Sequence, residues 1–73
     1  MENKELIELG EKIKKYRQEL SLSQEALAHK CDFDRTYISM LERGKRNPSY
    51  LNLLKLCKGL EIQIYELLED KNG

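Results

Sequence analysis

The chain of 73 residues offers room for one domain, and its 13 Lys and Arg balance 13 Asp and Glu to a formal net charge of +0. Because so short a chain buries only about 60% of its unfolded surface, we expect neither a cleft between two lobes nor a separate effector domain. The charge is unevenly distributed, since residues 12–60 carry eleven Lys and Arg against five Asp and Glu, and both ends are acidic. A zero total is therefore compatible with a basic face.

The composition also argues against membrane, secreted and metal-binding classes. No stretch approaches the roughly 20 apolar residues of a membrane span, and the charged N-terminus does not resemble a signal peptide. We therefore expect a cytoplasmic protein with no membrane partner and no small-molecule ligand. Cys31, Cys57 and His29 do not have the spacing of a zinc site or of a Cys–His catalytic pair. We expect two buried thiols, no metal or cofactor, and no enzymatic activity.

Helical spacing of apolar residues, with only four Gly and one Pro, predicts an all-α domain of five helices over residues 1–73. The first helix is expected over about 4–20, because its apolar residues recur at steps of three or four and share one face. Ser23 is a suitable N-cap for a short second helix from 24 to about 30. The turn that follows contains Asp32, which tolerates a left-handed backbone.

The third helix is expected over about 35–43, with Asp34 as its N-cap and Gly44 just beyond its end. Its inner face would consist of Ile38 and Leu41, which leaves the polar residues outside. A loop follows, since Pro48 disfavours a helical conformation for the residue before it.

The fourth helix is expected over about 50–58, with Ser49 as N-cap and Gly59 closing it. Two sets of residues could form its inner face, namely Leu51, Leu54 and Cys57, or Leu53 and Leu56. A fifth, short helix is expected over about 63–69.

Two short helices joined by a tight turn, the second polar on its outer face, predict a helix-turn-helix over about 24–43. Such a helix fits the major groove of DNA, where Arg35 can bind guanine through two hydrogen bonds and Thr36 and Ser39 can contact base edges. Flanking groups are expected to contact the phosphate backbone: Gln24, Tyr37, Arg43, Lys45, Arg46 and Asn47.

Three segments carry a family resemblance: Leu22-Ser-Gln-Glu-Ala-Leu-Ala28, Asp34-Arg-Thr-Tyr-Ile-Ser39 and Leu41-Glu-Arg-Gly-Lys-Arg-Asn-Pro-Ser49. They resemble the phage-repressor (Cro/C1-like) helix-turn-helix proteins and, within them, the controller proteins of restriction–modification systems. The resemblance implies that Gln24 contacts the DNA backbone and that Arg17 and Glu42 form a structural pair. It further implies a dimer interface on the fifth helix, with Ile64, Tyr65 and Leu68.

These features together predict a homodimeric, sequence-specific transcriptional regulator that binds a two-fold symmetric operator in double-stranded DNA. Two dimers on adjacent sites and RNA polymerase are further candidate partners. The controller resemblance implies activation of its own operon at low occupancy and repression at higher occupancy. The alternatives are a phage- or plasmid-type repressor or antitoxin with the same domain, and a helical protein-interaction module that does not bind DNA.

Overall fold

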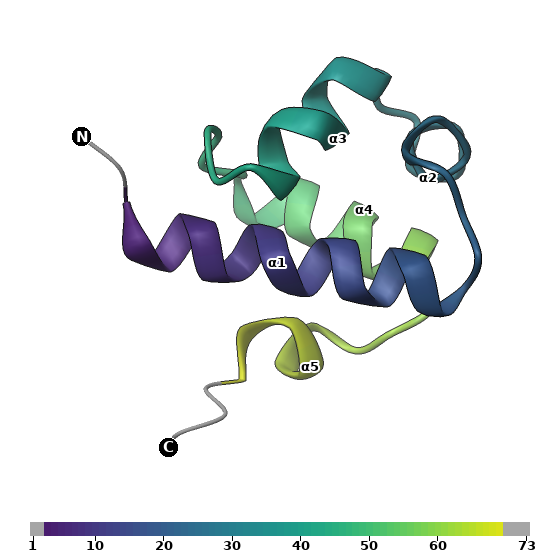
Figure 1. The fold of residues 1–73 in the computed structure, drawn as a ribbon. Helices are drawn as coiled ribbons and strands as arrows, with labels where there is room; N and C mark the ends of the chain where they lie inside the picture. The colour runs from purple at the N-terminus through teal and green to yellow at the C-terminus, as the bar shows by residue number, and fades with distance from the viewer. Residues whose placement is uncertain (1–2, 70–73) are drawn as a thin grey trace.

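The computed structural model describes residues 3–69 and confirms the predicted all-α fold of five helices. In Figure 1, α1 crosses the molecule, with α2, α3 and α4 on one side of it and α5 on the other. The helices are α1 (Lys4–Glu19), α2 (Gln24–Cys31), α3 (Arg35–Glu42), α4 (Tyr50–Leu60) and α5 (Ile64–Leu68).

The helix α1 lies close against the end of α3. The N-terminus of α1 is capped by Asn3, whose side-chain oxygen accepts a hydrogen bond of 3.1 Å from the backbone N–H of Leu6. Gly10 is buried, and a Cβ added there would approach the carbonyl oxygen of Glu42 to 2.6 Å. A glycine at this position therefore permits the close crossing of α1 and α3, which brings Arg17 within reach of α3.

One hydrophobic core joins all five helices. Burial of these apolar side chains supplies the main favourable term in the folding of so small a domain. The buried residues are Ile13 from α1; Leu27, Ala28 and Cys31 from α2; Ile38 and Leu41 from α3; Leu56, Cys57 and Leu60 from α4; and Leu67 from α5.

The helix α4 extends further than the sequence predicts. Gly59 does not close it but lies inside it, and the helix continues to Leu60 and is capped by Glu61 in a left-handed conformation with φ 60°. Gly59 is buried because α4 packs directly against α2 here, and a Cβ would collide with the Sγ of Cys31. The glycine therefore serves helix packing and not helix termination.

The inner face of α4 combines parts of the two predicted alternatives. Leu56 and Cys57 are buried and Leu53 packs against the core, whereas Leu51 and Leu54 are exposed. At its N-terminus, α4 is capped as predicted, since the Ser49 hydroxyl accepts a hydrogen bond of 3.1 Å from the N–H of Asn52.

The short helix α5 is attached to α1 by polar contacts. The Tyr16 hydroxyl donates to the carbonyl oxygen of Glu66 at 3.4 Å, and the Lys12 ammonium donates to the carbonyl oxygen of Glu69. The start of α5 is fixed by Glu66, whose carboxylate accepts a hydrogen bond of 2.7 Å from the N–H of Gln63. Between residues 3 and 69, the structure contains no helix with the length and apolar character needed to cross a membrane.

Candidate nucleic-acid interface

The helices α2 and α3 are joined by a short, well-defined turn. The Ser23 hydroxyl caps α2 by accepting a hydrogen bond of 3.0 Å from the N–H of Ala26. Asp32 ends α2 in the predicted left-handed conformation, with φ 61°. The second helix of the pair then begins at Arg35, and its inner residues Ile38 and Leu41 pack in the core. The geometry is that of a helix-turn-helix.

Asp34 occupies the predicted N-cap position of α3, but its side chain makes no capping hydrogen bond. The N–H of Tyr37 donates instead to the backbone carbonyl oxygen of Asp34 at 3.1 Å, which replaces the expected side-chain contact. The predicted capping role of this carboxylate is therefore wrong.

The outer face of α3 presents the three residues predicted to contact bases. Arg35 and Thr36 are exposed in the first turn of the helix, and Ser39 follows one turn later and is half-buried. The carbonyl oxygen of Ser39 accepts a hydrogen bond of 3.3 Å from Nε of Arg43, which keeps the Arg43 side chain beside the helix end.

A buried network ties α1, α2 and α3 together. Nε of Arg17 donates to Oε2 of Glu42 at 2.5 Å and Nη2 donates to Oε1 at 3.0 Å, so the predicted pair is a two-point ion pair. Nη1 of Arg17 donates to the carbonyl oxygen of Leu22 at 2.7 Å. The hydrogen bond to Glu42 raises the pKa of Arg17, against the lowering effect of burial, and the guanidinium is therefore charged.

Gln24, predicted to contact the DNA backbone, belongs to the same network. Its Nε2 donates to Oε1 of Glu42 at 3.1 Å. An amide nitrogen carries two hydrogens, and this bond uses one of them. The contact orients the side chain at the first position of α2, where free backbone N–H groups favour an anion.

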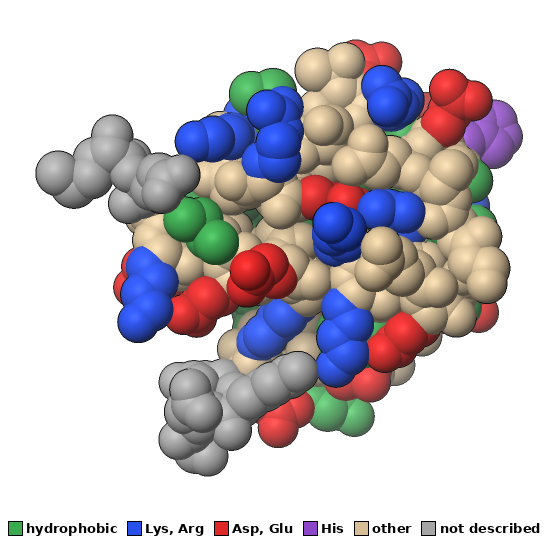
Figure 2. All heavy atoms as spheres, in the orientation of Figure 1, with side chains coloured by type: hydrophobic (Ala, Val, Ile, Leu, Met, Phe, Trp, Pro, Cys, Tyr) green, Lys and Arg blue, Asp and Glu red, His purple; other side chains and the backbone are tan. Residues whose placement is uncertain are grey.

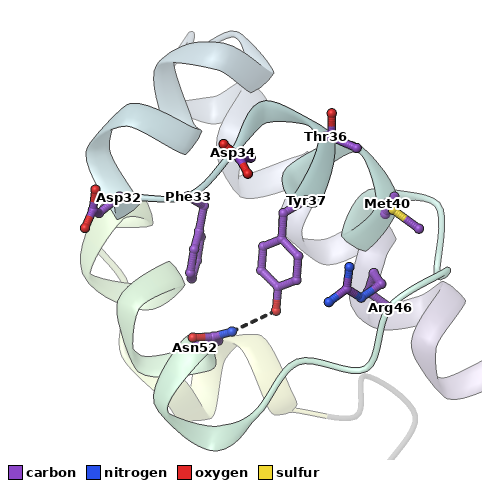
Figure 3. A pocket seen from close by; sticks show the side chains of 8 residues that line it. All are labelled: Asp32, Phe33, Asp34, Thr36, Tyr37, Met40, Arg46 and Asn52. Carbon is purple, nitrogen blue, oxygen red and sulfur yellow. Dashed lines mark hydrogen bonds between the residues drawn. The ribbon is translucent and has the colours of Figure 1, made fainter.

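Tyr37 does not stand free on α3 but is held on three sides. Its ring meets Phe33 edge-on, with centroids 4.8 Å apart and an interplanar angle of 64°, and the Arg46 guanidinium lies 4.9 Å from the Tyr37 centroid. Nδ2 of Asn52 donates to the Tyr37 hydroxyl at 3.0 Å. Figure 3 shows these side chains around an open pocket of about 510 Å³, lined by Asp32, Phe33, Asp34, Thr36, Tyr37, Met40, Arg46 and Asn52.

Neither Phe33 nor Asn52 is singled out as a site residue by the sequence. Asn52 lies fifteen positions from Tyr37 on a different helix, and its contact arises only because the fold places the first turn of α4 within reach of the Tyr37 side chain. The aromatic ring of Phe33 also receives Lys55 of α4, whose Nζ lies 4.6 Å from the ring centroid. In the sequence, the one feature that could have indicated this cluster is the aromatic residue Phe33, which lies beside the turn between α2 and α3.

The loop after α3 carries the remaining predicted backbone contacts. Arg43, Lys45, Arg46 and Asn47 are all exposed. The loop begins at Gly44, whose φ of 72° is a conformation that other residues rarely adopt. In Figure 2, Lys and Arg side chains gather over this loop, whereas basic and acidic side chains are mixed over α1. The basic side chains of the loop thus lie beside the C-terminal end of α3.

The helix α5 presents two of its three predicted interface residues to solvent. Tyr65 is 67% exposed and Leu68 is 55% exposed, whereas Ile64 packs against the core. These two side chains give α5 an exposed apolar surface, and Tyr50, Leu51 and Leu54 of α4 are exposed as well.

Both cysteines are buried free thiols, as the sequence predicts. Burial raises the pKa of each thiol, which disfavours the reactive thiolate. In the part of the chain that the structure describes, no cluster of His, Cys, Asp or Glu could hold a metal ion.

Comparison with known proteins matches this architecture to regulators. A family model described as helix-turn-helix matches residues 13–67. The chain is 51% identical over 65 residues to control protein C.MunI from Mycoplasma sp, covering 88% of each chain. It is 48% identical over 61 residues to control protein C.BamHI from Bacillus amyloliquefaciens, covering 82% of this chain and 75% of that one.

A solved structure extends the likeness to three dimensions. The restriction-modification controller protein C.AhdI from Aeromonas hydrophila superposes with a TM-score of 0.83 at 42% identity. The match covers 85% of this chain and 94% of that chain, so it includes most of the helices described above.

Proposed function

The chain belongs to the helix-turn-helix family of transcriptional regulators, and we propose that it is a restriction–modification controller that binds a two-fold symmetric operator as a homodimer. In this role α3 is the recognition helix, which enters the major groove of the operator.

The observation that carries the proposal is the division of α3 into a buried face and an exposed polar face. Ile38 and Leu41 are 0% and 1% exposed, whereas Arg35 and Thr36 project from the N-terminal turn. Residues at the start of a recognition helix are the ones that reach base edges. Arg35 would bind guanine O6 and N7, and Thr36 and Ser39 would contact neighbouring bases.

Phosphate contacts would come from both sides of this helix. Gln24 stands at the start of α2 with its amide fixed by Glu42, and its second amide hydrogen can donate to a phosphate oxygen. On the other side, Tyr37 and the loop residues Arg43, Lys45, Arg46 and Asn47 would contact the backbone. Such contacts give affinity and register without reading sequence.

Dimerisation would proceed through α5, where the exposed Tyr65 and Leu68 offer an apolar surface and the partly buried Ile64 packs against the core. A two-fold interface places identical surfaces against each other. The two recognition helices would then enter successive major grooves about 34 Å apart, which requires an operator with two-fold symmetry.

Regulation would follow from protein concentration. Two dimers binding cooperatively to adjacent sites would convert a modest rise in concentration into a switch from activation to repression of the chain's own operon. Activation would involve contact with RNA polymerase, and the operon would include a restriction endonuclease gene.

The decisive experiment is fluorescence anisotropy with the duplex from immediately upstream of its own gene, compared with a scrambled duplex over a salt series. We expect the wild type to prefer the native duplex and Arg35→Ala to lose about 1–3 kcal/mol of this discrimination per half-site. Binding of the variant to scrambled DNA should barely change, because phosphate contacts supply non-specific affinity.

Equal losses on both duplexes would contradict base reading by Arg35. Absence of wild-type binding to either duplex at low salt would overturn the proposal as a whole. Lys45→Ala provides a contrast, since the loss of a phosphate contact should weaken binding to all sequences and reduce the salt dependence.

A further inference from the structure

The hydroxyl of Tyr37 is held by a residue from outside the helix-turn-helix. Asn52 lies in the first turn of α4, is half-buried, and points its amide at the Tyr37 hydroxyl across the space between α3 and α4 (Figure 3). The N–O distance is 3.0 Å. The contacts with Phe33 and Arg46 fix the ring, so the amide meets a hydroxyl whose position is already defined.

The direction of this hydrogen bond determines what the hydroxyl can do next. A tyrosine hydroxyl has one hydrogen to donate and lone pairs that accept. Because Nδ2 of Asn52 donates, the Tyr37 oxygen accepts and its own hydrogen remains available to another partner. A hydroxyl that already accepts a hydrogen bond is also a better donor, since hydrogen bonds in a chain polarise one another.

The hydroxyl end of Tyr37 lies beside a cation, whereas Asp32 and Asp34, which also line the pocket, lie toward its other end (Figure 3). The Arg46 guanidinium lies over the Tyr37 ring, and Thr36 and Met40 of the recognition helix line the same pocket. A phosphate oxygen accepts hydrogen bonds and donates none, so it matches an outward-donating hydroxyl beside a cation.

We propose that Asn52 is a positioning residue for DNA recognition, which sets the Tyr37 hydroxyl as a hydrogen-bond donor to a backbone phosphate. The inference rests on the proposed function, because it presumes that α3 binds DNA. It adds to that function a residue of α4 that acts through Tyr37 without itself contacting the operator.

The test is a double-mutant cycle in operator binding, measured by anisotropy with the duplex from upstream of the gene. The four proteins are wild type, Asn52→Leu, Tyr37→Phe and the double variant. Leucine has the size of asparagine without its hydrogen-bonding groups. Gln18→Leu, which removes an exposed amide from α1, is the matched control. Circular dichroism at the same concentration confirms that each variant is folded.

We expect Tyr37→Phe to weaken operator binding by at least about tenfold, the lower end of the range for a hydrogen bond to a charged group. Asn52→Leu should weaken it by roughly three- to tenfold when Tyr37 is present, and by less than about twofold when the hydroxyl has been removed. Equal effects of Asn52→Leu in both backgrounds would overturn the proposal, because they would indicate a general structural role. An unchanged affinity of Asn52→Leu would also overturn it.

A second measurement identifies the acceptor. In a duplex scanned with single neutral methylphosphonates, the wild type should lose affinity at one phosphate of each half-site where Asn52→Leu loses none. If no position distinguishes the two proteins, the assigned hydrogen bond to phosphate is wrong.

A third variant keeps the proposal testable if Asn52→Leu does not fold. The carboxylate in Asn52→Asp can only accept hydrogen bonds, so the Tyr37 hydroxyl would donate its hydrogen to this carboxylate and not to a phosphate. The loss of operator affinity caused by Asn52→Asp should therefore be larger when Tyr37 is present than in the Tyr37→Phe background. Equal costs would overturn the proposal. A wild type that binds neither operator nor scrambled DNA would instead overturn the proposed function, which distinguishes the two failures.

Discussion

Removal of Glu42 should destabilise the domain more than any exposed substitution. The Glu42 side chain is 3% exposed and accepts hydrogen bonds from Nε and Nη2 of Arg17 and from Nε2 of Gln24. In Glu42→Ala the Arg17 guanidinium stays in its buried position and keeps its contact with the carbonyl oxygen of Leu22. Loss of one partner from a buried ion pair costs about 3–5 kcal/mol, because it leaves the other charge uncompensated.

That cost is large for this chain. A domain of 73 residues has a free energy of unfolding of roughly 4–11 kcal/mol at 0.05–0.15 kcal/mol per residue. Each 1 kcal/mol shifts the Tm of a domain of this size by about 4–8 °C, so Glu42→Ala should lower the Tm by at least about 12 °C. Thermal and urea unfolding followed by circular dichroism measure the effect, at one fixed protein concentration because the proposed dimerisation would make Tm concentration-dependent.

Two controls separate the buried pair from a general loss of charge. Glu11→Ala removes an exposed carboxylate from α1 and should change stability by less than about 0.5 kcal/mol. The double variant Arg17→Met/Glu42→Leu replaces both charges with apolar groups and should recover most of the lost stability. A Tm drop below about 5 °C in Glu42→Ala, or a double variant less stable than either single one, would refute the reasoning.

Three further outcomes follow from the packing. Gly59→Ala should lower the free energy of unfolding by about 1–2 kcal/mol in urea, because the added methyl group overlaps the Sγ of Cys31. Adding Cys31→Ala should reduce this loss of stability, and an equal loss in the double variant would contradict the contact. Because burial raises the pKa of both thiols, the unfolded chain releases protons first as the pH rises, so the free energy of unfolding should fall above about pH 8.5. The fall should be smaller in Cys57→Ala, and a pH dependence identical to that of the wild type would contradict a contribution from the buried Cys57 thiol. If the proposed dimer forms through α5, Leu68→Glu should convert it to a folded monomer in sedimentation equilibrium, and an unchanged mass would exclude α5 from the interface.

Sequence patterns predicted the local features of the fold well, because their causes are local. Ser23 and Ser49 cap helices as expected, since a hydroxyl before a helix can reach the third residue after it. Asp32 adopts the expected left-handed conformation. Each of these features depends on a few consecutive residues.

Features that depend on helix packing were not predictable in this way. Gly59 has the local character of a helix terminator, but its role is set by Cys31 of α2, which approaches from elsewhere in the chain. The left-handed residue that ends α4 is Glu61, for which no sequence preference exists. A periodicity argument also left two choices for the inner face of α4, because four leucines lie at compatible spacings.

The candidate site shows the same division. The resemblance predicted Arg17 and Glu42 as a structural pair and Gln24 as a separate contact to the DNA backbone. The structure joins them, since one carboxylate holds both the structural arginine and the glutamine at the start of α2. Only the crossing of α1 and α3, which Gly10 permits, brings these three side chains together.

This arrangement separates the residues that fix α3 from the residues that would read sequence. Glu42, the last residue of α3, ties the end of this helix to α1 and α2, and Tyr37 ties its middle to α4. Arg35 and Thr36 project from the first turn of α3 into solvent. Substitutions at exposed positions usually change stability by less than about 0.5 kcal/mol. Under the proposed function, operator preference would therefore change through Arg35 and Thr36 at little cost in stability, while changes at Glu42 would alter the fold and DNA binding together.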